Sequence, residues 1–272
     1  MEPSSNAHRT DQVPLPSAGL GDGETAAAPS GSGRRTFVLL MLTILVAALG
    51  AFGYVQSRNG QLAAREAEAK AELQKLGVFL TSSGSGEHVG NANLSLVRTP
   101  ENFERAMELL ADLPWLEVVA LSGQQVNEEQ LASLASLTKL DSLQVSNTGI
   151  GDSALAVLAR FPALGSLHVN GNALTNACLD DLGSLTSLEV LDLSETDLSG
   201  DLAPLAGLTE LNWLVLRGVP LDDAALATLA GLPKLKRLTL EEGQITREQY
   251  AKLQQGSGLQ VDGMGEPAAR DQ

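Results

Sequence analysis

The stretch LTSLEVLDLSE, residues 185–195, decides the fold of this chain. Its leucines occupy the first, fourth, seventh and ninth positions. Leu191 and Leu193 are two residues apart and point to one side of a short strand, because successive side chains of a strand alternate between its faces. Leu155 and Leu158, which follow another copy of the pattern, are three residues apart and belong to a helical turn. One unit is therefore a strand followed by a helix.

The same pattern recurs from residue 113 onward. Its six copies are spaced by 24, 24, 24, 23 and 24 residues and begin at Leu113, Leu137, Phe161, Leu185, Leu208 and Leu232. A single unit cannot bury its own leucines, whereas stacked units join their apolar faces into one continuous core. Because every layer of such a stack has the same thickness, the core has few places for a bulky ring, and aromatic residues make up only 3% of the chain.

These repeats resemble the leucine-rich repeat family, with its L-x-x-L-x-L-x-x-N/T signature, over about residues 90–262. The resemblance implies an α/β solenoid with parallel strands on a concave face and helices on a convex face. The subtype is similar to the 24-residue, ribonuclease-inhibitor-like repeats and to bacterial membrane-anchored leucine-rich repeat proteins. The family's ladder asparagine is present only at Asn172, and its equivalents are Gln124, Thr148, Thr196, Val219 and Gly243. We expect these departures to weaken the buried hydrogen-bond ladder without threatening the fold.

The N-terminal part of the chain predicts a tail and a membrane span. Residues 1–33 are rich in Ser, Gly, Pro and Ala, so they form a predicted disordered tail. From Phe37 to Val55 the chain has 19 residues without a charge, which is long enough to cross a hydrocarbon core of roughly 30 Å. We therefore predict one transmembrane helix over residues 36–56, retained as an anchor. Arg34 and Arg35 resemble the start of a twin-arginine export signal, so a cleaved leader stays as the alternative.

The basic residues around this span predict its orientation. Arg34 and Arg35 abut its N-terminal end, and four further basic residues follow its C-terminal end within about 20 residues, so the positive-inside rule is nearly balanced. The arginine pair is closest to the span, and glutamates dilute the later basic residues. We expect a single-pass membrane protein whose C-terminal domain is extracytoplasmic.

Residues 57–76 are rich in Ala, Glu and Lys and predict a helical stalk. The alternatives are a coiled coil, which would give a weak homodimer through the stalk, and a single helix whose last turns dock on the following domain. The second is favoured because the stalk has fewer than three heptads. After the stalk we expect an N-terminal cap, made of a hairpin plus a helix, over residues 77–112, the repeats over residues 113–262, and a disordered tail over residues 263–272.

The net charge argues against one class of partner, and the cysteine content excludes two kinds of structural site. The chain has 18 basic and 33 acidic residues, a net charge of −15, and residues 78–272 hold 11 of the basic and 26 of the acidic ones. Nucleic-acid binding depends on Lys and Arg displacing counterions, so we expect no nucleic-acid partner. The single cysteine, Cys178, excludes an intrachain disulfide and a Cys-rich metal site, and we expect a core role for it. No cofactor is expected.

Binding candidates lie at the positions that alternate with the buried leucines, because these side chains face outward on the concave side. The candidates are Gln144, His168, Asp192, Trp213, Arg217 and Arg237. Trp213 is a large ring where the other repeats carry Ser, Val or Arg, and Trp and Arg are the residues most enriched in binding hot spots. The simpler alternative is that Trp213 only covers its neighbours and that the two arginines pair with Glu241.

His168 and Asp192, with Ser166 or Ser194, invite comparison with a catalytic triad. A triad needs a convergent pocket with oxyanion donors, whereas these residues lie on an open sheet whose backbone N–H groups are used in strand pairing. Two ligands are also too few for a metal site. We therefore expect no enzyme, but a membrane-anchored module that binds another protein through its concave face. The alternative is a purely structural envelope or scaffold protein without a discrete ligand.

Overall fold

A computed structural model describes residues 31–84, 86, 88–254 and 258–263. These residues fall into two compact units, which divide after Ser57. The predicted tails lie outside the described residues, except for residues 31–33 and Gly263. Residues 31–33 belong to the first helix, so the boundary that we predicted for the N-terminal tail is wrong by three residues. A helix that is already nucleated gains a hydrogen bond for each added residue, which favours this extension.

Helix α1 (Gly31–Lys75) makes up all of the first unit that the structure describes and continues into the second. From Leu40 to Val55 its side chains are exposed, with Leu40 at 57% and Phe52 at 62%. The helix is long and apolar enough to cross a membrane. A signal sequence near the N-terminus satisfies the same criterion.

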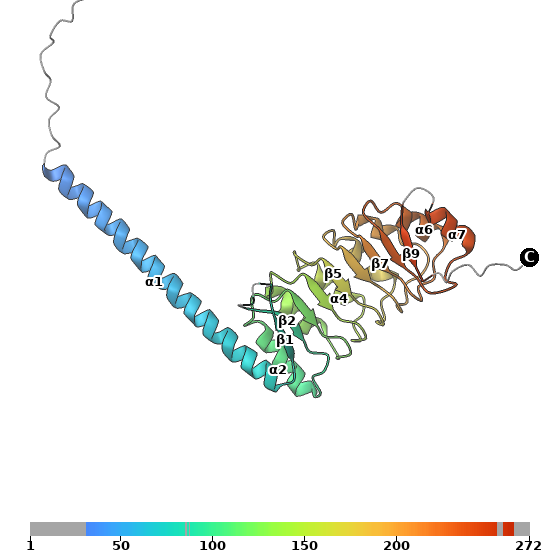
Figure 1. The fold of residues 1–272 in the computed structure, drawn as a ribbon, viewed down its shortest axis with the longest axis horizontal. Coiled ribbons are helices and arrows are strands. Elements are labelled where there is room, and N and C mark those ends of the chain that lie inside the picture. The colour runs from blue at the N-terminus through green and yellow to red at the C-terminus, as the bar shows by residue number, and fades with distance from the viewer. Residues whose placement is uncertain (1–30, 85, 87, 255–257, 264–272) are drawn as a thin grey trace, which may run out of the picture. The chain divides into compact units, whose positions relative to one another are not determined.

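The second unit contains a nine-stranded sheet whose strands follow one another in chain order (Figure 1). β1 pairs antiparallel with β2, and each later pair is parallel. The strands are β1 (Phe79–Ser82), β2 (Val89–Asn93), β3 (Val118–Ala120), β4 (Ser142–Gln144), β5 (Ser166–His168), β6 (Val190–Asp192), β7 (Trp213–Val215), β8 (Arg237–Thr239) and β9 (Gln260–Asp262). The connecting helices and 3₁₀ turns are α2 (Pro100–Leu110), α3 (Glu128–Ser133), η1 (Leu134–Ser136), α4 (Ser153–Leu158), η2 (Asn176–Cys178), α5 (Leu179–Gly183), η3 (Ala203–Gly207), α6 (Asp223–Ala230) and α7 (Arg247–Gln254).

The strand register follows the sequence repeat. Along the parallel strands the register joins Val118, Ser142, Ser166, Val190, Trp213 and Arg237 in one row. The central residue of each strand from β3 to β8, such as Leu167 or Leu191, is fully buried. This arrangement confirms the predicted fold class, a mixed α/β domain built on a parallel sheet.

One hydrophobic core runs through the second unit from Ala69 to Val261. Leucines from both the strands and the outer segments are buried, and Leu155 and Leu158 of α4 have no exposed surface. Phe161, the one aromatic residue at a repeat start, is only 5% exposed. The core is therefore the stack of leucine layers that the repeat predicts.

The outer segments are less regular than one helix for each repeat. The expectation of a helix is wrong at η3, which forms only a 3₁₀ turn and belongs to the shortened 23-residue repeat. Here successive layers approach closely, because a Cβ atom added to Gly207 would lie 2.3 Å from the backbone oxygen of Gly183. The tighter 3₁₀ winding fits this shorter connection.

The last turns of α1 pack against the domain. Ala69 and Leu73 are 2% and 0% exposed and belong to its hydrophobic core, whereas Leu62 is 43% exposed. The Glu66 carboxylate accepts a hydrogen bond from the backbone N–H of Val89, at 3.0 Å, and contacts Nδ1 of His88 at 2.8 Å. The structure thus has the docked helix, the second of the two alternatives for the stalk.

Candidate functional site

The outward side of the sheet, opposite the buried leucines, forms a continuous surface that we call the open sheet face. Its side chains are Phe79 and Thr81 on β1, Asn91 and Asn93 on β2, the first and third residues of β3 to β9, and the residues two positions beyond β3 to β8: Ser122, Ser146, Asn170, Ser194, Arg217 and Glu241. All six residues that the sequence predicts as binding candidates lie on this face. The strand register places Gln144, His168 and Asp192 next to one another on adjacent strands. It also places Trp213 directly across from Arg237.

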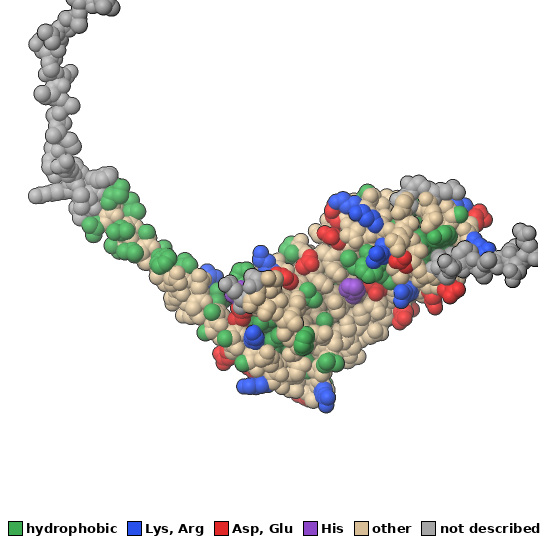
Figure 2. Space-filling model, viewed as in Figure 1, with side chains coloured by type: hydrophobic (Ala, Val, Ile, Leu, Met, Phe, Trp, Pro, Cys, Tyr) green, Lys and Arg blue, Asp and Glu red, His purple; other side chains and the backbone are tan. Residues whose placement is uncertain are grey.

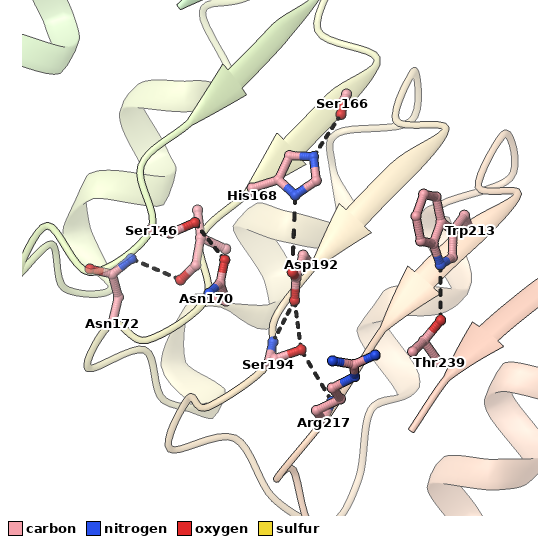
Figure 3. Close-up of polar contacts among 11 residues, drawn as sticks. Ser146, Ser166, His168, Asn170, Asn172, Asp192, Ser194, Trp213, Arg217 and Thr239 are labelled. Carbon is pink, nitrogen blue, oxygen red and sulfur yellow. Dashed lines mark hydrogen bonds and ion pairs between the residues drawn. The ribbon is translucent and has the colours of Figure 1, made fainter. Parts of the chain in front are cut away.

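Trp213, the first residue of β7, is held by its neighbours on β8. Its indole Nε1 donates a hydrogen bond to Oγ1 of Thr239 at 3.1 Å (Figure 3). The Arg237 guanidinium lies over the ring, 5.1 Å from its centroid, which is a favourable cation–π distance. The ring is half-buried, so it presents apolar surface in one fixed orientation.

The two arginines of the face do not pair with Glu241, so the simpler alternative for them is wrong. Nε of Arg237 lies 3.5 Å from a carboxylate oxygen of Asp262 on β9. Arg217 is exposed, and within the described residues no carboxylate lies within ion-pair distance of it. In Figure 2, basic and hydrophobic side chains lie side by side at the place where Figure 1 labels β7.

A string of polar groups crosses the middle of the face (Figure 3). Oγ of Ser166 is 3.3 Å from Nε2 of His168, and Nδ1 of His168 is 4.0 Å from Oδ2 of Asp192. The latter distance is too long for a hydrogen bond. Asp192 is instead directed to Ser194, because its Oδ1 accepts from the backbone N–H at 2.9 Å and from the hydroxyl at 2.7 Å.

This geometry suits recognition better than nucleophilic catalysis. Among the described residues, no carboxylate lies within hydrogen-bond distance of the His168 imidazole, and nearby strand N–H groups are paired within the sheet, for example Val169 N–H with the Asp192 carbonyl at 3.0 Å. Oxyanion stabilisation needs free donors that converge on one point. Gln144 is half-exposed beside His168 and adds a neutral donor and acceptor to the same surface.

Cavities of a few hundred Å³ lie away from this face. A cavity of about 470 Å³ lies between α2 and the turn before α3, and its lining includes Arg98, Phe103 and Gln130. Another, of about 260 Å³, lies between α6 and α7, and its lining includes Leu226, Leu253 and Lys252. The open sheet face is a surface rather than a pocket, so its contacts suit an extended partner.

Metal and thiol chemistry have little support in the described part of the chain. No cluster of three or more His, Cys, Asp or Glu residues is placed there to hold a metal ion. Cys178 has no exposed surface. Burial, together with the nearby Asp152 carboxylate, raises the pKa of the Cys178 thiol to about 12. The thiol is therefore protonated and packed in the core at neutral pH.

Several solved structures align with this chain. An internalin (InlF) from Listeria monocytogenes aligns with a TM-score of 0.50 and 23% identity over 65% of this chain and 54% of its own. Internalin C2 of the same organism aligns with a TM-score of 0.45 and 28% identity over 58% of this chain and 65% of its own. The receptor in the solved complex of PEPR1 with AtPEP1 aligns with a TM-score of 0.43 and 20% identity over 69% of this chain and 26% of its own. The chain thus spans about half the length of InlF.

The chain has a leucine-rich repeat fold. No model of a protein family matches its sequence. No curated protein matches it either.

The leucine-rich repeats are joined by the side chain of Asn172. Its Nδ2 donates to the carbonyls of Val145 and Val169, both at 2.8 Å. Its Oδ1 accepts from the backbone N–H groups of Thr148 at 3.0 Å and Gly149 at 2.9 Å. One buried amide therefore fixes the turns that follow β4 and β5, and with them the strands that carry Gln144 and His168.

The repeat alignment misses part of this ladder and part of the face. We expected Gly243 at the ladder position of the last repeat, whereas Gln244 fills it and donates to the carbonyls of Leu216 at 2.7 Å and Val219 at 2.6 Å. Phe79 is 66% exposed and pairs with Asn93, so it extends the open sheet face at the N-terminal end. Alternation along the β1 hairpin is the signal that could have placed Phe79 there.

Proposed function

We propose that this chain is a membrane-anchored module that binds another protein through the open sheet face. The observation that carries the proposal is the fixed pair of Trp213 and Arg237 beside the unpaired Arg217. Holding a large ring in one orientation before binding reduces the entropy lost on association. Tryptophan and arginine are also the residues that most often dominate interface energetics.

Photo-crosslinking in cells tests this role. A photoreactive amino acid at Gln144, on the open sheet face, is expected to form adducts with a second protein. As the control, the photoreactive amino acid is placed instead at Ala227, which is exposed on α6 on the opposite side of the domain. Trp213→Ala should abolish the adducts formed from position 144 while leaving the amount of folded protein unchanged. Adducts from position 227 alone would contradict binding through the open sheet face, and the absence of adducts from both positions would support a purely structural scaffold.

We propose that α1 anchors the chain as a single-pass span with the repeat domain outside the cytoplasm. Arg34 and Arg35 at the start of the helix support this orientation. Protease added to intact cells should remove the repeat domain, and full protection of the domain contradicts the exported orientation. The intact mass of the mature chain distinguishes a retained anchor from a cleaved leader.

We also propose that the domain is not a hydrolase. The distance of 4.0 Å between His168 and Asp192 supports this. Purified protein should hydrolyse neither generic ester nor peptide substrates, and activity that disappears in His168→Ala would overturn the proposal.

A further inference from the structure

Positive charge on the open sheet face is confined to two neighbouring strands. Among the described residues of this face, Arg217 and Arg237 are the only Lys or Arg side chains. They stand out because residues 78–272 hold 26 acidic and only 11 basic residues. The end of the face that carries Trp213 is therefore the part able to attract an anion.

Nearby acidic groups leave much of this positive charge available. Asp192 already accepts two hydrogen bonds from Ser194. Nε of Arg237 lies 3.5 Å from a carboxylate oxygen of Asp262, and Asp262 also accepts a hydrogen bond from Gln260 at 2.8 Å. Arg217 has no ion-pair partner in the part of the chain that the structure describes. A guanidinium with free N–H groups can bind a carboxylate through two parallel hydrogen bonds.

The spacing of the two arginines defines the shape of what they can bind. Arg237 lies directly across from Trp213, and Arg217 follows Trp213 by four residues. At roughly 3.3 Å per residue, the two charged positions are about 13 Å apart along the strand direction. Trp213, which is half-buried and lies across from Arg237, provides apolar surface at one end of this span. An extended peptide covers the same distance in four residues.

We propose that the partner docks an extended acidic segment here, with two carboxylates four residues apart and an apolar side chain between them. The carboxylates pair with Arg217 and Arg237, and the apolar side chain packs on Trp213. This inference rests on the proposed protein-binding function and specifies the chemistry of the partner. The net negative charge of the domain does not prevent such docking, because charges more than about 8 Å away are largely screened at physiological ionic strength.

Selection from a displayed library of random 12-residue peptides tests the proposal directly. The target is the full chain, held in detergent micelles. Enriched peptides should carry Asp or Glu at two positions four residues apart, with an apolar residue between them. Selection on Arg217→Gln should retain only one of the two acidic positions. A synthetic consensus peptide should bind Arg217→Gln at least about tenfold more weakly than the unaltered chain, as expected for the loss of one charge-assisted contact.

Two matched variants sharpen the measurement. Arg160→Gln makes the same change of charge at an exposed position on the loop after α4, and it should leave the affinity of the consensus peptide unchanged. Glu241→Gln removes the acid beside Arg217 and should strengthen binding. Both variants change exposed side chains, so neither is expected to disturb folding.

The outcomes separate this inference from the proposed function. A basic or uncharged consensus, an Arg217→Gln affinity no weaker than that of Arg160→Gln, or the absence of any enriched peptide overturns the acidic-segment proposal. Protein adducts from position 144 that depend on Trp213 would then still support a protein-binding face. If those adducts are absent as well, both the acidic-segment proposal and the proposed protein-binding function are contradicted.

Discussion

Replacement of Asn172 by alanine should destabilise the repeats more than a matched change at Thr196, the equivalent ladder position one repeat later. The amide side chain is 4% exposed and makes two hydrogen bonds through Nδ2 and further ones through Oδ1. After truncation the Val145 carbonyl still accepts a hydrogen bond from the hydroxyl of Thr148, at 2.7 Å. Gly149 is exposed, so its N–H can bond to water instead. The Thr148 N–H and the Val169 carbonyl lose their side-chain partner inside the core.

Those two groups set the size of the effect. An unsatisfied buried N–H or carbonyl costs about 1–2 kcal/mol, so Asn172→Ala should lower the free energy of unfolding by about 3 kcal/mol. Thr196 occupies the equivalent position one repeat later and makes a single hydrogen bond, from its hydroxyl to the Leu193 carbonyl at 2.7 Å. Thr196→Val, which keeps the shape of the side chain, should therefore cost only about 1 kcal/mol.

Guanidinium denaturation followed by tryptophan fluorescence measures both variants. The chain has two tryptophans, Trp115 and Trp213, and both lie in the repeat domain, so α1 contributes no tryptophan signal. Asn172→Ala should lower the denaturation midpoint by about 0.6 M without changing the slope of the transition. Equal midpoints for Asn172→Ala and Thr196→Val would refute the argument that the amide joins two repeats.

Three further predictions concern the stalk, the thiol and a close backbone contact. Leu73→Ala should cost about 3 kcal/mol because its side chain is buried, whereas the exposed Leu62→Ala should change the unfolding midpoint little; equal losses would instead indicate a helix–helix dimer. Cys178 should react with a thiol reagent at pH 8 only in denaturant, because its thiol is buried in the folded protein. Its pKa is raised from 9.0 to about 12 in the folded state, so the contribution of the protonated thiol to stability should be present below pH 9 and decline as the pH rises to 12. Gly207→Ala should cost at least about 2 kcal/mol, since the new methyl group would meet a backbone oxygen at 2.3 Å, whereas Gly151→Ala, with open space around it, should unfold at nearly the same midpoint.

The sequence repeat predicts the sheet and its register well. A period that is strictly held places the same backbone position of each unit side by side, so the repeat alone is enough to predict that His168 and Asp192 are neighbours. The repeat cannot predict how their side chains turn. Asp192 is directed to Ser194, which leaves His168 at 4.0 Å, and this choice depends on local hydrogen bonds rather than on the period.

Features that break the period are the ones that sequence analysis misses. Gln244 takes the ladder position one residue later than expected and still donates to the carbonyls of Leu216 and Val219, a shift that an alignment with a fixed period cannot show. Phe79 lies on an antiparallel strand outside the repeats, so no alignment of repeats includes it. The partner of Arg237 is Asp262, on a final strand whose sequence no longer follows the repeat signature.

The uniform layers that make this fold predictable also limit what its sheet can do. Neighbouring strands lie about 4.8 Å apart and offer side chains of similar height, so a bound molecule meets a surface rather than an enclosed pocket. Selectivity on such a surface depends on side chains that depart from the small polar residues of the other repeats. Trp213, Arg217 and Arg237 are such departures, and they lie on β7, on the turn after it and on β8, in a domain with an excess of acidic residues. We therefore expect recognition to depend on the few side chains that differ from the repeat pattern, which the regular stack of repeats holds in position.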